Sequence, residues 1–155
     1  MTGSSWVRVG AVLGFLAVSL GAFGAHGLKA RLDALGTAAN YQTAVQYHVY
    51  HALAILTVGV MAGRHPTSTA SNVAGWSFLL GVFVFSGSLY VLSLTGMKWL
   101  GAITPIGGLA MLVGWAALAV AATNATGPGG SRSSSGPNAT QADRPLSAVQ
   151  TEDRR

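Results

Sequence analysis

The sequence predicts an all-α membrane protein, a polytopic bundle of four transmembrane helices followed by a disordered C-terminal tail. Composition points to this class, because 50% of the 155 residues are hydrophobic and only 8% are charged. A soluble domain carries roughly 25% charged residues. The apolar residues also gather in four stretches, and a membrane-spanning helix needs about 20 of them. We therefore expect one transmembrane domain over residues 1–123 and a polar tail over residues 124–155.

The four apolar stretches contain no acidic side chain, and each is long enough to span the bilayer as a helix. The second stretch is the least apolar, because only residues 49–62 are close to continuously apolar. None of the stretches alternates polar and apolar residues, as the strands of a membrane β-barrel do. The expected helices cover about residues 7–25, 41–62, 73–94 and 99–122.

Short connections join these stretches, so consecutive helices are expected to run antiparallel as neighbours. The first connection, residues 27–40, places Leu28, Leu32 and Leu35 on one face of a short helix and its charged side chains on other faces. Such a helix is expected to lie on the membrane surface. Basic residues near the membrane are balanced between its two sides, and only the amino terminus and the tail arginines favour a cytoplasmic location for both termini.

Tryptophan and leucine positions predict which parts of the helices meet the bilayer. Tryptophan prefers the two membrane interfaces because its ring is amphipathic. The tryptophans are therefore expected at the interfaces, with Trp6, Trp76 and Trp115 on one side and Trp99 on the other. The alternative is that some of these rings pack between helices. Among the leucines, we expect Leu79 and Leu118 to face the lipid chains.

The two ends of the chain differ from its middle. The tail is rich in Gly, Pro, Ser and Asn, as in GPGGSRSSSGPN, and cannot bury enough apolar surface to fold. At the other end, Arg8 followed by an apolar stretch also resembles a cleavable signal peptide. A retained helix is favoured because the small residues Ala17, Gly21 and Ala25 continue to its end as a packing face.

Several classes of function lack the residues they need. The formal net charge is +5, but the basic residues are dispersed singly and form no patch for nucleic acid. The chain has no cysteine, which excludes disulfides, thiol catalysis and thiolate metal sites. It also has no phosphate-binding loop, dinucleotide fingerprint, zinc-protease motif or activated serine. We therefore expect neither an enzyme nor a bound cofactor.

Histidines form the most informative polar cluster, in the segment YQTAVQYHVYHALAIL. Tyr41, Ala44, His48 and His51 recur at steps of three and four residues, so they share one helix face. Ionisable side chains at membrane depth usually face the bundle interior, where they mark functional sites. Three histidines could bind a metal, but neutral rings hydrogen-bonded to neighbouring helices explain them more simply, and we predict no metal. The expected polar site comprises His26, Tyr47, His48, His51, Ser86, Tyr90 and Thr104.

Small residues recur along the apolar stretches, where they let helices approach closely without a hydrophobic driving force. An alternative for the fourth helix is local unwinding at Thr104, Pro105, Gly107 and Gly108, which would expose backbone carbonyls as in transporters. The positions expected to pack helices together are Gly14, Gly21, Gly24, Gly87, Gly107 and Gly108.

Four ordered motifs resemble the YgdD-type family of small membrane proteins. They are GAFGAH at 21–26, Tyr-His and His-Ala-Leu-Ala within 47–54, FSGSLY at 85–90, and TPIGG followed by GW within 104–115. The resemblance covers about residues 9–122. It implies four helices in a bacterial inner membrane, and hence a multi-pass protein of the cell membrane. It implies no activity, because the family has no known function.

Three functions fit these features. The first is a non-catalytic accessory or assembly factor that acts through helix–helix contacts in the lipid bilayer, with further copies as a homo-oligomer or with other membrane proteins. The second is an oligomeric transporter or channel for a small solute or ion, with the polar site at its mouth. The third is a redox component that binds a metal or haem through the histidines. The glycine-rich faces and the lack of catalytic motifs favour the first.

Overall fold

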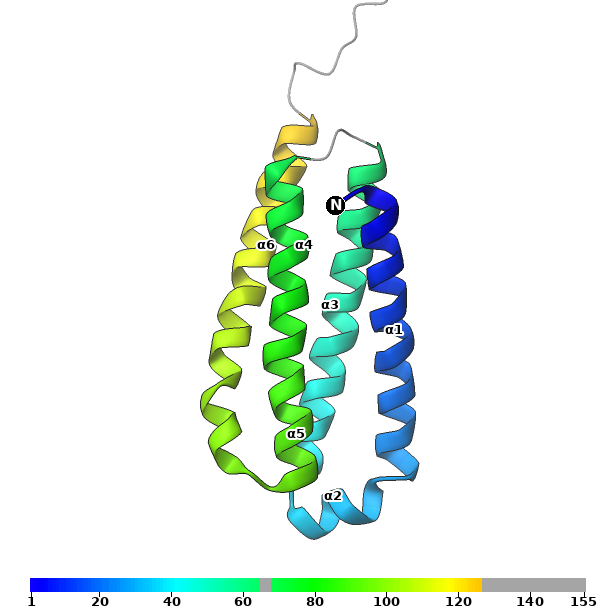
Figure 1. The fold of residues 1–155 in the computed structure, drawn as a ribbon, viewed down its shortest axis with the longest axis vertical. Helices are drawn as coiled ribbons and strands as arrows, with labels where there is room; N and C mark the ends of the chain where they lie inside the picture. Colours follow the sequence, from blue (N-terminus) through cyan, green and yellow to red (C-terminus); the bar gives the residue numbers. More distant parts are fainter. Residues whose placement is uncertain (65–67, 127–155) are drawn as a thin grey trace, which may run out of the picture.

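Four long helices stand side by side in the computed structural model, which describes residues 1–64 and 68–126, with side chains up to residue 123 (Figure 1). The first span is α1, Gly3–His26. A short helix, α2, Lys29–Leu35, precedes the second span, α3, Ala38–Arg64. The third span consists of α4, Thr69–Gly81, the π-helical turn η1, Val82–Ser86, and α5, Gly87–Thr95. The fourth consists of the 3-10 helix η2, Lys98–Ala102, and α6, Thr104–Thr126.

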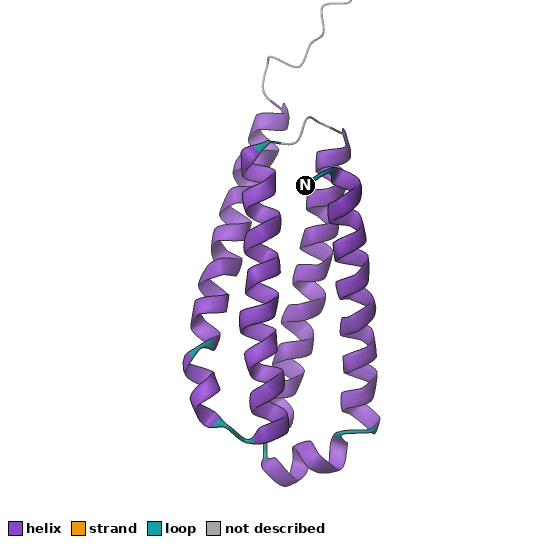
Figure 2. Ribbon diagram, in the orientation of Figure 1, coloured by secondary structure: helices purple, strands orange, loops and turns teal. Residues whose placement is uncertain are grey.

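Every described element is a helix, as the composition predicted (Figure 2). All four spans are long and apolar enough to cross a membrane, and each extends beyond the predicted helix at both ends. Polar caps explain two of the earlier starts: the hydroxyl of Thr2 accepts a hydrogen bond from the Ser5 N–H at 3.3 Å, and that of Ser68 accepts one from the Ser71 N–H at 3.1 Å. The predicted tail lies outside the described residues from 127 onward, so its disorder stays a prediction.

The bundle consists of two antiparallel pairs, because α1 packs along α3 and α4 packs along α6. α3 also contacts α4, η1 and α5 and thereby joins the two pairs. The N-terminus and the end of α6 lie at the same end of the bundle, while α2 crosses the opposite end (Figure 1). In α2, Leu32 is buried while Lys29 and Asp33 are exposed, which is the pattern of an amphipathic helix at a membrane surface.

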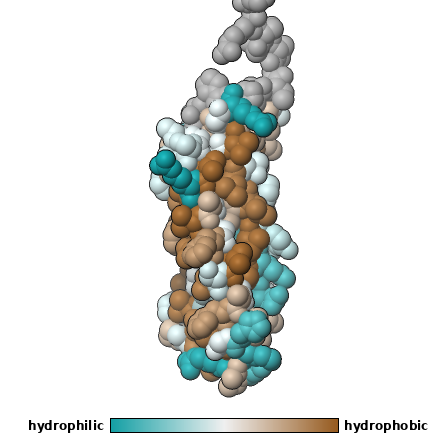
Figure 3. All heavy atoms as spheres, turned by 90° about the vertical axis from the view of Figure 1, so that its right-hand side faces the viewer, coloured by the Kyte–Doolittle hydropathy of each residue, from teal (hydrophilic) through white to brown (hydrophobic). Residues whose placement is uncertain are grey.

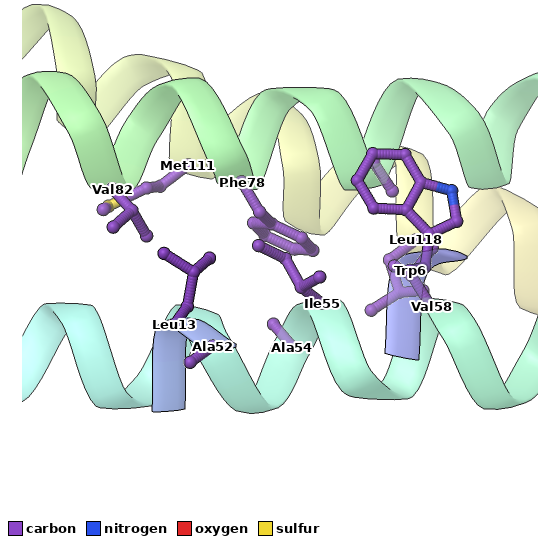
Figure 4. Packing of buried hydrophobic residues seen from close by; sticks show 11 residues of the cluster. Trp6, Leu13, Ala52, Ala54, Ile55, Val58, Phe78, Val82, Met111 and Leu118 are labelled. Carbon is purple, nitrogen blue, oxygen red and sulfur yellow. The ribbon is translucent and has the colours of Figure 1, made fainter. Parts of the chain in front are cut away.

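An apolar core runs between the four spans (Figure 4). Trp6 is fully buried in this core, and its indole Nε1 donates to Asn72 Oδ1 at 3.3 Å. Trp115 lies halfway along α6 beside His51, so its expected position at an interface is wrong. Leu118 was expected to face lipid but is a core residue, and Leu79 is half-buried against the core. An uninterrupted apolar run does not show which of its faces turns inward.

The third and fourth spans each contain an irregular segment. At η1 the Gly87 N–H donates to the Val82 carbonyl five residues earlier, which widens the helix by one residue. In the fourth span the helix breaks at Ile103, between η2 and α6. The alternative of unwinding over 104–108 is therefore wrong, because these residues are helical. Pro105 lies in the first turn of α6, where a missing backbone N–H breaks no hydrogen bond.

Candidate functional site

A buried row of polar side chains lies where α3 packs against η1 and α5. On the α5 side, Ser86, Tyr90 and Ser93 recur at steps of four and three residues and therefore share a helix face. On the α3 side, Tyr41 and His48 contribute their rings. We call these five residues the polar seam. Ser86 and Ser93 are completely buried, and His48 is 5% exposed.

Hydrogen bonds and ring contacts join the polar seam to three spans. His48 Nδ1 lies 3.3 Å from the Tyr90 hydroxyl, and the Tyr90 ring meets the Tyr41 ring edge-on at a centroid distance of 5.2 Å. The Tyr41 hydroxyl donates to the Leu20 carbonyl of α1 at 2.8 Å. At the α2 end of the seam, the Thr37 hydroxyl donates to the Ser93 carbonyl at 2.7 Å. These bonds fix the relative positions of α1, α3 and α5.

His51 lies one turn deeper on the same face of α3, and both of its ring nitrogens have partners. Its Nε2 accepts a hydrogen bond from Trp115 Nε1 at 3.3 Å, and its Nδ1 lies 2.8 Å from the Tyr47 carbonyl. An indole N–H can only donate and a carbonyl can only accept. The pair of contacts therefore assigns a neutral imidazole with its proton on Nδ1.

His48 differs from His51 because its second nitrogen is unpaired. His48 Nε2, Ser86 Oγ and Ser93 Oγ are buried without a hydrogen-bond partner among the described residues. Leaving such a group unpaired costs about 1–3 kcal/mol. Buried water molecules in native proteins typically bond to polar groups of this kind.

The remaining candidate residues lie around the seam or away from it. Ser88 and Thr104 share a hydrogen bond of 2.9 Å, which ties α5 to the start of α6. Tyr47 is 39% exposed and stacks on Phe85 at a centroid distance of 4.4 Å. His26 is exposed at the end of α1. Within residues 1–64 and 68–126, no three His, Asp or Glu side chains are grouped closely enough to hold a metal.

The glycines expected to pack helices fall into two groups. A Cβ added at Gly24 would collide with the Tyr41 ring, and one at Gly107 would collide with the backbone of Phe85. The approaches at Gly21 and Gly108 are looser. A Cβ added at Gly21 would lie 3.2 Å from Val45 Cγ1, and one added at Gly108 would lie 3.7 Å from the Phe85 ring. Gly14 and Gly87, by contrast, have no atom within 4 Å of the position of an added Cβ, so they hold no helices together.

A recess of about 350 Å³ opens where the end of α1, α2 and the start of α3 meet. Gly21, Gly24 and Tyr41 line it, together with Lys29 and Asp33. The Lys29 ammonium donates to Asp33 Oδ2 at 2.7 Å, and this hydrogen bond raises the pKa of Lys29. Lys29 and Asp33 thus form an exposed ion pair that lines the recess at this end of the bundle.

The outward face of α3 is polar over much of its length, which sequence reasoning missed. Gln46 and Tyr50 lie near the middle of the helix, are exposed, and have no hydrogen bond to any described residue. By contrast, the exposed hydroxyls of Ser19 and Thr57 donate to backbone carbonyls of their own helices. The i, i+4, i+8 spacing of two glutamines and a tyrosine was the signal available in the sequence. The exposed face, which we call the outer stripe of α3, comprises Ala39, Gln42, Gln46, Tyr50, Leu53, Thr57 and Val60.

The class of protein follows from the distribution of polarity. On the side of the bundle where α1 lies, hydrophobic side chains cover most of the middle, and hydrophilic ones gather at the ends and along one edge (Figure 3). Four apolar spans with polar groups between them define a multi-pass membrane protein.

The chain belongs to the family described as "Protein of unknown function (DUF423)", whose model matches residues 20–108. The UPF0382 membrane protein YwdK of Bacillus subtilis (strain 168) is 44% identical over 117 residues, which cover 76% of this chain and 94% of the relative. The UPF0382 membrane protein SH2409 of Staphylococcus haemolyticus is 45% identical over 115 residues, covering 74% of this chain and 92% of the relative. No solved structure matches the chain. The names of these relatives place them in membranes and state no activity.

Proposed function

We propose that this protein is a non-catalytic accessory or assembly factor of the cell membrane, which acts through helix–helix contacts with other membrane proteins or with further copies of itself. The observation that carries the proposal is the outer stripe of α3, where Gln46 and Tyr50 are exposed without hydrogen-bond partners. The resemblance to the YgdD-type family adds the expectation that these contacts form in an inner membrane.

The depth of these two residues makes their exposure costly. α3 has 27 residues and is therefore about 40 Å long, against a hydrocarbon core of about 30 Å. Gln46 and Tyr50 are five residues or fewer from His51, the midpoint of α3, which places them within about 8 Å of the centre of the core. Lipid chains offer no hydrogen bond to an amide or a hydroxyl at that depth. A neighbouring helix with a polar group does, which favours association there.

The interior of the bundle supports a structural rather than a catalytic role for its polar groups. His51 is held neutral between Trp115 and the Tyr47 carbonyl, and Ser88 is bonded to Thr104. In neither pair does a base face an activated nucleophile, which acyl-transfer chemistry requires. These hydrogen bonds hold the spans in register.

Photo-crosslinking in native membranes tests the proposal. A photoreactive amino acid is placed at position 46 of the full-length chain, and the control carries it at position 112, where Leu112 is 66% exposed on α6. We expect protein adducts from position 46 and only lipid adducts from position 112. Lipid adducts alone from both positions would contradict the proposal.

A second candidate function is a transporter or channel, favoured by the three unpaired atoms of the polar seam. A seam that admits ions or water would give these atoms their missing partners. Proteoliposomes with an internal pH-sensitive dye measure proton flux as a probe. If the seam conducts, the flux should exceed that of empty vesicles and fall on His48→Leu. A flux equal to that of empty vesicles speaks against proton conduction through this seam.

A further inference from the structure

We infer that the outer stripe of α3 is a two-fold interface with a second copy of this chain. The inference rests on the proposed function and names the partner that covers Gln46 and Tyr50. It assigns the stripe to a symmetric dimer in the plane of the membrane.

The outer stripe has the spacing and the length that helix pairing needs. Its seven positions, from Ala39 to Val60, follow one another at steps of three or four residues. Positions spaced in this way form one continuous line along a helix, which a second helix can follow. The line spans 21 residue steps and is therefore about 32 Å long, close to the thickness of the hydrocarbon core. No charged residue lies on it, so two copies do not repel each other there.

Symmetry explains why a second copy suits this surface. In a dimer whose two copies have the same orientation in the membrane, a two-fold axis along the membrane normal makes the two α3 helices parallel. Each residue of the stripe near this axis then meets its own counterpart at the same depth. The Gln46 carboxamide has both donors and acceptors, so it pairs with another Gln46. The Tyr50 hydroxyl is self-complementary for the same reason.

Large apolar side chains are exposed on three other elements of the bundle. They include Phe15 on α1 at 73%, Phe83 on η1 at 65% and Leu112 on α6 at 66%. Lipid chains solvate such side chains as well as a protein does. The contrast within one molecule therefore places the interface on α3.

Disulfide crosslinking in native membranes tests the dimer, since the chain has no cysteine of its own. Full-length variants carry Gln46→Cys, Tyr50→Cys or, as a control on an exposed apolar face, Leu112→Cys. After mild oxidation we expect a disulfide-linked dimer from positions 46 and 50 and none from position 112. A second measurement counts subunits by single-molecule photobleaching in liposomes. Gln46→Leu should weaken dimerisation about three- to twentyfold, the range given by one interhelical hydrogen bond, while Gln46→Asn should weaken it less.

The outcomes separate the inference from the proposed function. Equal crosslinking at positions 46 and 112, or unchanged dimerisation of Gln46→Leu, overturns the two-fold interface. Crosslinking of position 46 to a different membrane protein also overturns it, while the proposed function stands. If position 46 is labelled by lipid alone, both fail. A 46–46 disulfide together with weaker dimerisation of Gln46→Leu supports both.

Discussion

At the scale of single residues, two neighbouring histidines have different surroundings. The face that Tyr41, Ala44, His48 and His51 share is buried, in agreement with their spacing in the sequence. The sequence does not show which partner each ring meets, because the partners come from other spans. His51 reaches Trp115, 64 residues away, whereas His48 reaches Tyr90 and leaves one nitrogen unpaired.

The contact between His51 and Trp115 should be measurable as a coupling energy. His51→Leu is expected to lower the free energy of unfolding by about 1–3 kcal/mol, because the Trp115 N–H loses its acceptor. In a double-mutant cycle with Trp115→Phe, the coupling should be about 0.5–1.5 kcal/mol. Denaturant unfolding in mixed micelles measures both values. His26→Leu, at an exposed helix end, is the control and should have little effect. Strict additivity of the two changes would contradict the contact.

Two nearby serines should respond oppositely to the loss of their hydroxyls. Ser86 Oγ is buried without a partner, so Ser86→Ala should leave stability unchanged or raise it. Ser88 shares its hydrogen bond with Thr104, so Ser88→Ala should lower the free energy of unfolding by about 1 kcal/mol. Thermal unfolding of the two variants in the same detergent makes the comparison. A clear loss of stability in Ser86→Ala would show that this hydroxyl has a partner.

At the scale of elements, regular helices were predictable and irregular turns were not. Long apolar runs and the Leu28, Leu32 and Leu35 spacing predicted the spans and the short helix α2, because both signals are local. The π-helical turn η1 has no such signal. It brings the backbone of Phe85 against Gly107 of α6, so its cause lies in the packing of two spans that are distant in sequence.

Glycine replacements should separate packing positions from free ones. Gly107→Ala is expected to destabilise the protein by about 1–3 kcal/mol, because the new Cβ meets the Phe85 backbone and α6 must move away from η1. Gly14→Ala is the matched control, because an added Cβ there meets nothing within 4 Å. It should be neutral or stabilising by up to about 1 kcal/mol through its better helix propensity. Equal effects at the two positions, measured by unfolding in mixed micelles, would argue against the close approach.

At the scale of the whole molecule, the sequence predicted an antiparallel bundle but not which side of α3 faces outward. The histidines indicate one face of this helix as a candidate site because histidine is ionisable. The glutamines lie on another face, and the sequence alone does not show whether that face is exposed or buried. Only the packing of α1, α4, η1 and α5 around α3 shows that the outer stripe is left uncovered.

The position of Gln46 at membrane depth depends on α3 crossing the bilayer, which topology reporters can test. α3 is the least apolar of the four spans. It is therefore the segment that an alternative topology would leave outside the membrane. Reporter domains fused after Gly36, Ser68 and Met97 should show Gly36 and Met97 on one side of the membrane and Ser68 on the other. The fusion after Met97 is the internal control, because α4, η1 and α5 form a strongly apolar span between it and Ser68. If Gly36 and Ser68 reported the same side, α3 would not span the membrane, and neither the polar seam nor the two-fold interface could lie within the hydrocarbon core.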